Sequence, residues 1–440
     1  MLSEFVEVTE GIYKLKRNGL TVTMLLTQTL FEALEPSALE QLEHALHLPG
    51  LERVIITPDV HPGYAVPIGF TAVSKTHLYP DTVGPDPACS VSLSCLDYSG
   101  FNGLDKPSRR ALINAFEETI SVTKRRRKDR VTRQHSSIKF DELWAIVTGE
   151  RRSAKTWVAQ HKPLKLWDAQ LLSAFGSLFE QLVSKSHLGQ LGSIGGGNHF
   201  LEVQQGDDQK LYVMAHFGSR GLGARGAEYF FKQIRQEMSQ ALGREVAGNE
   251  LLYVRADSRL GQLYFMFQEA MLEYATYNHR VVQTAATEIL CEHLGLSESA
   301  AEFLGHIPHN FIELKEGAYW QRKGTTPAYN NDGIPLLIPG SMATASYVLA
   351  PGPNAATYGE SVPHGAGRVL SRKVAKETLE QDNLDREFDA RGVMGSFRHV
   401  PLDESSAAYK DVDEVIKAVV QSGVAVVINR LRPVLVLKGE

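Results

Sequence analysis

Cysteine is scarce in this chain of 440 residues, which has only Cys89, Cys95 and Cys291. Three thiols cannot form a disulfide framework, and an odd number favours a reducing compartment. The sequence also lacks a run of 18 apolar residues that could span a membrane as a helix. Its N-terminus, MLSEFVEVTEG, is acidic where a secretory signal is basic and then apolar. We therefore expect a cytoplasmic protein with no membrane partner.

An excess of positive charge is missing as well. The chain has 46 basic and 51 acidic side chains, for a formal net charge of -5. Such a chain does not coat nucleic acid non-specifically, so any nucleic-acid site must be a local patch. The basic runs that could form one are KRRRKDR, residues 124–130, and a stretch with Arg151, Arg152 and Lys155. A solvated charged loop is the simpler interpretation of KRRRKDR.

Common nucleotide and hydrolase motifs are absent or out of context. The sequence has no G-x-x-x-x-G-K-[ST] loop and no G-x-S-x-G elbow. GLGARG, residues 221–226, matches the dinucleotide fingerprint between a predicted strand and a predicted helix. No second strand with an acidic end follows about 20 residues later, since Glu245 and Glu250 stand at the end of the helical region and in a loop. We therefore expect no Rossmann site.

Short strands and amphipathic helices alternate along the chain, which indicates mixed α and β structure. The patterns predict strands over residues 20–26, 51–57, 200–204 and 211–216, and helices over residues 36–48, 227–242 and 261–294. Longer helical patterns enclose the basic runs between about residues 102 and 187. No repeat or Pro/Ser-rich linker divides the chain. We predict one α+β catalytic unit over residues 1–440, with a helical, basic insertion at about 102–187.

Six of the fifteen histidines stand in runs crowded with Gly, Pro, Asn or Asp, which are typical of strand-to-loop junctions. They are His61, His199, His216, His306, His309 and His364. Loops at strand ends can aim side chains at one point, while glycine lets the backbone approach a ligand closely. For His61 or His306 taken alone, an exposed or internally hydrogen-bonded loop residue is the simpler interpretation.

The run GPDPACS adds Asp86 and Cys89, three positions apart in a turn. A thiol, a carboxylate and several imidazoles are the ligand inventory of a mononuclear or dinuclear transition-metal site. Cys89 is the bridging candidate, because a thiolate can bind two metals and Asp86 and two prolines are unusual neighbours for a core thiol. We expect Cys95 and Cys291 to be core residues instead.

The run PHGAGR places His364 before two glycines and Arg368, and after a predicted turn with Ser341 and Ser346. Backbone N–H groups, hydroxyls and a guanidinium beside an imidazole suit phosphate chemistry, with the imidazole as base or nucleophile. A structural histidine in a turn is the alternative interpretation of this motif.

Taken together, these runs resemble the RtcB family of GTP-dependent RNA ligases. The matching blocks run from Asp59 to Lys438 and are DVHPG, DPxC, GGGNHFLEV, HxGSRG, HN, RKG, PGSMxTASYV, HGAGR, AYKDVDEV and the terminal LKG. The resemblance implies a single α+β domain with a deep cleft for two manganese ions. It also implies GTP-dependent joining of RNA 2′,3′-cyclic phosphate or 3′-phosphate ends to 5′-hydroxyl ends, in RNA repair or tRNA splicing.

The resemblance also implies a role for individual residues. Asp86, Cys89 and His199 would hold one metal ion, and Cys89, His216 and His309 the other. His364 would attack the α-phosphate of GTP and carry GMP. Asp59 would support the metal site by contacting residues around it, without binding a metal ion itself. Nucleotide contacts are implied for Asn198, His199, Phe200, Leu201, Glu202, His309, Asn310, Pro339, Gly340, Ser341, Met342, Ser346, His364, Gly365, Ala366, Gly367, Tyr409 and Lys438.

Several departures and alternatives accompany the resemblance. Pro85, Pro87 and Ser90 depart from the family pattern around the cysteine, Gln321 replaces a histidine, and SVTKRRRKDRVTRQ replaces a Pro/Gly-rich segment. Ligand chemistry alone favours zinc over manganese. A cyclic phosphodiesterase without ligation, or a non-catalytic RNA-binding paralogue built round KRRRKDR, remain alternative functions. We expect a monomer with RNA as its partner, and an archease-like activator as a further partner to be tested.

Overall fold

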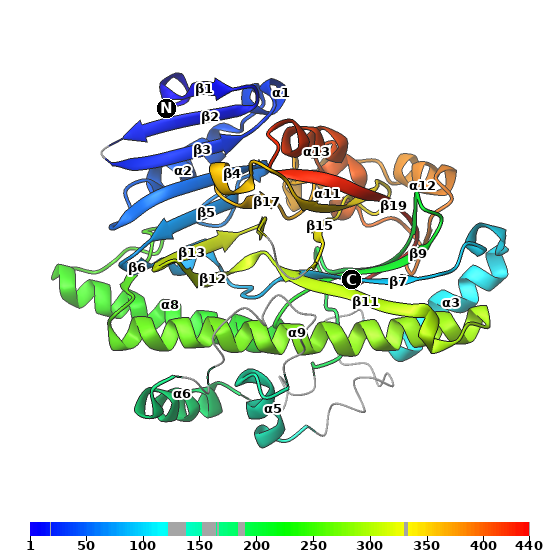
Figure 1. Ribbon diagram of the computed structural model, residues 1–440, viewed down its shortest axis with the longest axis horizontal. Helices are drawn as coiled ribbons and strands as arrows, with labels where there is room; N and C mark the ends of the chain where they lie inside the picture. The colour runs from blue at the N-terminus through cyan, green and yellow to red at the C-terminus, as the bar shows by residue number, and fades with distance from the viewer. Residues whose placement is uncertain are drawn as a thin grey trace.

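Two large β-sheets stand above one long helix in the computed structural model (Figure 1). The structure describes residues 1–17, 19–121, 138–151, 164, 167–183, 190–329 and 333–439. Its first sheet has the strand order β1-β2-β3-β4-β5-β13-β12, and its second has the order β11-β7-β9-β8-β19-β16-β15 with β18 beside β19. This mixture of helices and largely antiparallel strands confirms the predicted α+β class.

The strands of the first sheet are β1 (Val6–Thr9), β2 (Ile12–Arg17), β3 (Leu20–Leu25), β4 (Leu51–His61), β5 (Ile68–Ser74), β12 (Asn310–Lys315) and β13 (Ala318–Lys323). Those of the second are β7 (Ser90–Leu96), β8 (Phe200–Gly206), β9 (Leu211–Phe217), β11 (Ala301–Pro308), β15 (Leu336–Ile338), β16 (Ser346–Pro351), β18 (Met394–Gly395) and β19 (Ala425–Lys438). Two further pairs are β6 (His77–Leu78) with β10 (Val254–Arg255), and β14 (Thr325–Pro327) with β17 (Ser361–Pro363).

The α-helices are α1 (Gln28–Glu32), α2 (Pro36–Ala45), α3 (Lys106–Thr119), α5 (Phe140–Val147), α6 (Ala169–Leu182), α8 (Arg220–Leu242), α9 (Arg259–Leu294), α10 (Ala355–Tyr358), α11 (Arg372–Thr378), α12 (Gln381–Ala390) and α13 (Val412–Gln421). Short 3-10 helices include η2 (Pro80–Thr82) and η7 (Leu402–Glu404). The predicted strands correspond to β3, β4, β8 and β9, and the predicted helices to α2, α8 and α9, so these predictions are confirmed.

Helix α9 packs against one face of the second sheet. Its 36 residues span about 54 Å at the usual rise of 1.5 Å per residue. The Ser258 side chain caps its first turn by accepting from the N–H of Gly261, and Gly295, with a left-handed φ of 67°, ends it. One side of α9 packs on β7, β9 and β11, and α5 and α6 also contact it (Figure 1).

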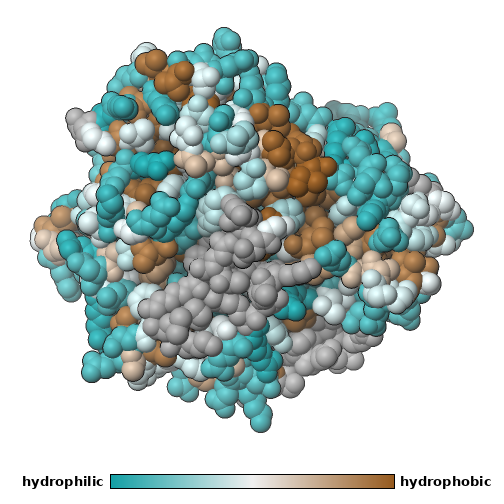
Figure 2. Space-filling view, in the orientation of Figure 1, coloured by the Kyte–Doolittle hydropathy of each residue, from teal (hydrophilic) through white to brown (hydrophobic). Residues whose placement is uncertain are grey.

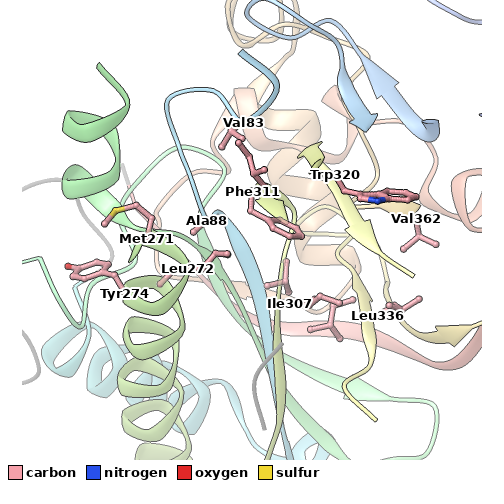
Figure 3. Packing of buried hydrophobic residues seen from close by; sticks show 14 of the residues in the cluster. Val83, Ala88, Met271, Leu272, Tyr274, Ile307, Phe311, Trp320, Leu336 and Val362 are labelled. Carbon is pink, nitrogen blue, oxygen red and sulfur yellow. The ribbon is translucent and has the colours of Figure 1, made fainter. Parts of the chain in front are cut away.

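The core between α9 and the strands also anchors the loop that carries Cys89. Met271 and Leu272 of α9 lie in one buried cluster with Ile307 of β11 and Phe311 of β12 (Figure 3). Ala88 belongs to this cluster and is fully buried, with a left-handed φ of 61°. A bend locked in the core therefore precedes the thiol, so the direction of its side chain is fixed by packing.

The GLGARG motif lies inside α8, which begins at Arg220 rather than near residue 227 as predicted. A Cβ on Gly226 would lie 2.2 Å from the ring of Phe267 on α9. The glycine thus permits two helices to pack closely, and the motif forms no phosphate-binding loop between strand and helix.

The predicted insertion is only partly within the described residues. Its described part contains helices α3, α5 and α6, with Leu143, Phe175 and Phe179 buried. Arg151 is exposed, whereas KRRRKDR, Arg152 and Lys155 fall outside the described residues. The limits of the insertion, and its contact with RNA, stay predictions.

The surface is mainly hydrophilic on the face in Figure 2, with a hydrophobic group of atoms in its upper central part. The exposed apolar side chains of β19 are Val426, Val427 and Ile428. Within the ranges that the structure describes, every helix is too short or too polar to cross a bilayer.

Candidate metal and nucleotide site

Five predicted metal ligands converge at the edge of the second sheet. Cys89 precedes β7, His199 precedes β8, His216 lies near the end of β9, and His309 stands between β11 and β12. The Sγ atom of Cys89 is 3.2 Å from Nε2 of His216 and 3.6 Å from Nε2 of His199. The strands β7, β9 and β8 are neighbours in the sheet, and β11 lies on the other side of β7. Sheet pairing thus gathers residues that are far apart in the sequence.

The ligand atoms form two groups that share the thiol. One group is Cys89, His216 and His309, and the other is Asp86, Cys89 and His199; the atoms of each group lie within 4.8 Å of one another. The Nε2 atoms of His216 and His309 are 3.2 Å apart, and Nε2 of His199 is 3.2 Å from Oδ2 of Asp86. Neighbouring N and S ligands around one tetrahedral ion are separated by about 3.3–3.6 Å. The donor set and its spacing therefore fit two transition-metal ions bridged by a thiolate.

Hydrogen bonds to backbone carbonyl groups fix the orientation of these ligand residues. The Nδ1–H of His199 donates to the carbonyl of Ile194 at 3.1 Å, so the Nε2 lone pair points to Cys89 and Asp86. The N–H of His309 donates to the carbonyl of Cys89 at 3.0 Å, and the N–H of Ala88 donates to the carbonyl of Asn310 at 2.7 Å. The two ligand loops are thereby held together by the backbone.

The pKa shifts in the cluster leave its imidazoles in the neutral form. Burial, and then the neighbouring Asp86 carboxylate, raises the pKa of the Cys89 thiol well above its ordinary value. Burial opposes ionisation of Asp86 as well, but the hydrogen bond and charge of His199 lower the pKa of that carboxyl. Burial, and then the adjacent histidines, lowers the pKa of His216 and of His309 far below the ordinary range. Neutral imidazoles are the form that binds metal.

His364 stands beside this cluster, directly after β17. Its ring centroid is 4.9 Å from that of His309. Its Nδ1 lies 2.7 Å from Oδ2 of Asp59, which is completely buried at the bend of β4. Asp59 therefore contacts the predicted nucleophile directly.

Most residues expected to bind the nucleotide line one cavity of about 260 Å³. The cavity is lined by the predicted residues Asn198, Phe200, Glu202, Pro339, Gly340, Ser341, Met342, His364, Gly365, Ala366, Gly367, Tyr409 and Lys438, together with His216. Its lining thus joins β8, the loop after β15, the loop after β17 and the end of β19.

Five residues expected at the nucleotide do not line this cavity. Two of them, His199 and His309, belong to the two ligand groups instead. The side chain of Leu201 lies on the other face of β8, in a second core cluster. Ser346 is buried, and its hydroxyl oxygen accepts from Nε2 of Gln204 at 3.0 Å and from the N–H of Gly340 at 3.2 Å. Asn310 accepts from the N–H of Gly324 at 2.8 Å. Ser346 and Asn310 are placed to shape the neighbouring loops, and Leu201 can offer only its backbone.

Comparison with known proteins identifies the family. The family model described as tRNA-splicing ligase RtcB matches residues 41–439. The chain is 31% identical to the tRNA-splicing ligase RtcB of Archaeoglobus fulgidus, over 94% of this chain and 93% of that protein. It is also 31% identical to the RNA-splicing ligase RtcB of Mycobacterium tuberculosis, over 91% of this chain and 100% of that protein. The chain belongs to the RtcB family.

This RtcB chain also has a cluster of ion pairs around the buried Glu404 at the end of the cavity. The sequence analysis did not predict this cluster. Nζ of Lys438 lies 2.9 Å from Glu404, and the hydroxyl of Tyr409 donates to the same carboxylate at 2.7 Å. Arg372 is 2.9 Å from Glu404 and also lines the cavity. Glu404 has no periodic signal in the run LDESSAAYKD; its position shortly before the AYKD motif is the only indication in the sequence.

Three of the six histidines lie inside strands, each within two residues of the strand end, as expected for strand-to-loop junctions; His61 is the last residue of β4. His216 and His306 lie within strands β9 and β11, because β-sheet pairing continues through their glycine-rich surroundings. His306 is fully buried, its Nδ1 is 3.3 Å from the Thr276 hydroxyl, and it belongs to neither ligand group. His61 is also internally hydrogen-bonded, through Nδ1–H to the carbonyl of Asp59 at 2.7 Å, yet it lines the cavity.

The departures from the RtcB pattern have local structural roles. The hydroxyl of Ser90 donates to the carbonyl of Ala88 at 2.8 Å, which closes the turn around the cysteine. The Gln321 amide accepts from the N–H of Tyr79 at 2.6 Å and donates to the carbonyl of His77 at 3.0 Å. Cys291 is buried as predicted, and Cys95 is partly buried against the core.

Proposed function

We propose that this protein is a GTP-dependent RNA ligase. It would join RNA ends that carry a 2′,3′-cyclic phosphate or a 3′-phosphate to ends that carry a 5′-hydroxyl, through a covalent histidine–GMP intermediate. The observation that carries the proposal is the position of His364, between two groups of metal-ligating side chains and the cavity lined by Glu202, Tyr409 and Lys438.

His364 is the proposed nucleophile. Because its Nδ1–H donates to Asp59, the lone pair of the ring is on Nε2 and is free to attack. A bond forms between Nε2 and the α-phosphorus of GTP as pyrophosphate leaves. Asp59 holds the ring in place and compensates the positive charge that develops on it.

The two ligand groups would hold two metal ions, with Asp86, Cys89 and His199 on one ion and Cys89, His216 and His309 on the other. Bound ions would supply Lewis-acid polarisation of phosphoryl oxygens and a water molecule with a lowered pKa. Manganese is expected from the family resemblance, whereas the thiolate and imidazole donors suit zinc, so the test below compares both ions.

The far end of the cavity suits a guanine base. Glu202 is buried, which raises the pKa of its carboxyl to about 7, and its oxygen accepts from Nε2 of Gln204 at 2.7 Å. A carboxylate at this position accepts from guanine N–H groups, and the ammonium of Lys438 donates to a carbonyl such as guanine O6. Backbone N–H groups of residues 365–367 and the Ser341 hydroxyl are donors for the phosphates.

The RNA steps follow from phosphate chemistry. Water adds to the cyclic phosphate, breaks the bond to the 2′-oxygen and leaves a 3′-phosphate. An oxygen of that phosphate then takes GMP from His364, which restores the free imidazole. The 5′-hydroxyl oxygen finally attacks the 3′-phosphorus, loses its proton and displaces GMP as the new phosphodiester forms.

The test is guanylation of the protein without RNA. Incubation with GTP labelled at the α-phosphate and with Mn²⁺, Zn²⁺ or Mg²⁺ should leave label on His364, as identified by mass spectrometry. His364→Ala should abolish the label, and His44→Ala, at an exposed histidine on α2, should retain it. If no metal gives an adduct on His364, the proposal is wrong. End processing that survives His364→Ala would instead support a phosphodiesterase that does not ligate.

A further inference from the structure

Tyr64 is the one exposed side chain among the phenylalanines, tyrosines and tryptophans that the structure describes, with 82% of its area accessible. Aromatic rings carry a large apolar surface and are usually buried or half-buried in a protein of this size. A fully displayed ring is therefore a feature that the fold itself does not explain.

The position of Tyr64 relates it to the proposed active site. It lies in the loop that joins β4 to β5, and the last residue pair of this hairpin is His61 with Ile68. Both residues of that pair line the cavity that also contains His364. A Cβ built on Gly324 would lie 2.4 Å from Ile68 and 2.9 Å from the His364 ring, so Ile68 and His364 flank the same point. Tyr64 is thus displayed on a loop whose base borders the nucleophile.

The loop is held rigidly in this position. The amide of Gln41 on α2 donates to the carbonyl of Gly63 at 2.9 Å and accepts from its N–H at 2.9 Å. Val66 is completely buried in the N-terminal core cluster. A Cβ on Gly63 would lie 2.1 Å from the carbonyl oxygen of Val66, so the turn closes too tightly for another residue. The fold therefore fixes the backbone beside Tyr64 while its ring stays in solvent.

We propose that Tyr64 stacks on a nucleobase at an RNA end that enters the cavity. This inference rests on the proposed RNA ligase function. Bases of single-stranded ends are free to stack on aromatic side chains, and such stacking tolerates any base identity. Charged groups near His364 can hold the phosphate, but they do not fix the rotation of the nucleotide. A stacked base would do so, and would keep the terminal phosphorus aligned with His364.

The first test compares Tyr64→Ala with Tyr64→Phe and with Ile428→Ala, an exposed apolar control on β19. Guanylation by GTP without RNA should be the same in all variants, because Tyr64 does not line the nucleotide cavity. Ligation of short single-stranded oligonucleotides by Tyr64→Ala should lose roughly 5- to 150-fold in kcat/KM, mainly through KM. Tyr64→Phe should retain most of the activity, and Ile428→Ala all of it.

The second test identifies the stacked base. An abasic nucleotide is placed either at the 3′-phosphate end or at the 5′-hydroxyl end of the substrates. At the end that Tyr64 contacts, the wild type should lose the same factor as Tyr64→Ala, and the variant should lose nothing more. The inference is overturned if Tyr64→Ala ligates as well as the wild type, which would assign the ring to another contact such as a protein. It is also overturned if, at either end of the substrate, the loss caused by the abasic nucleotide adds in full to the loss caused by Tyr64→Ala, so that the two factors multiply. Absence of guanylation in the wild-type protein would overturn the proposed function instead.

Discussion

The carboxylate of Asp59 accepts two hydrogen bonds from His364, at 2.7 Å from the ring Nδ1–H and at 3.2 Å from the backbone N–H. Its other oxygen accepts from the Thr57 hydroxyl at 2.6 Å. Burial alone would raise the pKa of Asp59, but the hydrogen bond and charge of His364 lower it. An ionised Asp59 thus sets both the position and the tautomer of the proposed nucleophile.

Asp59→Asn should reduce the rate of His364 guanylation by roughly 10²- to 10⁴-fold, because an amide can stabilise the wrong tautomer of the ring. The measurement is single-turnover labelling with GTP, with circular dichroism to confirm folding. Thr57→Val is the matched control, since it removes one hydrogen bond to the Asp59 carboxylate but leaves the contact with His364 in place, and it should cost about tenfold. Labelling of Asp59→Asn at the wild-type rate would show that Asp59 is only structural.

Because the Cys89 thiol belongs to both ligand groups, we predict that variants of different ligand residues lose different numbers of metal ions. Cys89→Ala should lose both ions and His199→Ala only one, because Cys89 belongs to both ligand groups. Elemental analysis of dialysed protein measures this, with Cys291→Ala, at a buried thiol on α9, as the control. Equal metal content in Cys89→Ala and the wild type would contradict the bridge.

Metal affinity should also increase with pH, since binding displaces a proton from the thiol, whose pKa is raised by burial and by Asp86. The expected slope is about tenfold in affinity per pH unit for each proton displaced. Competition with a chelator at pH 6, 7 and 8 measures it. An affinity independent of pH would mean that Cys89 is already a thiolate without metal.

His306 should make the metal-free protein sensitive to acid. Burial lowers its pKa to about 3 in the folded state, below the ordinary value of 6.5. The unfolded chain therefore binds more protons as the pH falls from 6.5 toward 3, and the free energy of unfolding falls by about 1.4 kcal/mol per pH unit in this window. Above pH 6.5 the stability should not depend on this group.

His306→Gln should make this loss of stability less steep, because glutamine does not titrate. Thermal midpoints at pH 7.5, 6.0 and 5.0 measure the slope. His44→Gln, at an exposed histidine, should leave it unchanged. Other buried histidines such as His279 also contribute, since burial and then His306 lower the pKa of that ring. An unchanged slope in His306→Gln would contradict the prediction.

Gly226 should be sensitive to substitution for a structural reason only. Gly226→Ala places a Cβ against Phe267 and should reduce the free energy of unfolding by roughly 1–3 kcal/mol. Gly248→Ala is the control, because a Cβ there meets open space. Denaturant titration compares the two, and guanylation per folded molecule should be unchanged in both. A specific loss of GTP binding in Gly226→Ala would restore a nucleotide role for GLGARG.

The candidate metal ligands could be predicted from the sequence, because Asp86, Cys89 and His199 stand in Gly- and Pro-rich runs whose order matches a family. Their division into two groups was predicted only through the family resemblance, because the residue pattern itself does not show the pairing of β7, β9 and β8 on which the division depends. The run around His306 resembled the other histidine runs, yet β11 carries that ring into the core. Glu404 was missed because a carboxylate in a polar loop has no pattern of its own, and only the fold brings it to Lys438.

The place of β19 in the second sheet bears on when the protein becomes active during its synthesis. This strand is formed by residues 425–438, yet it lies between β8 and β16 and carries Lys438 to the cavity. While residues up to Tyr409 leave the ribosome, the sheet still has a gap at its centre and the nucleotide cavity lacks one wall. The cavity of a nascent chain is therefore incomplete before β19 inserts, which would separate translation from the proposed ligation in time.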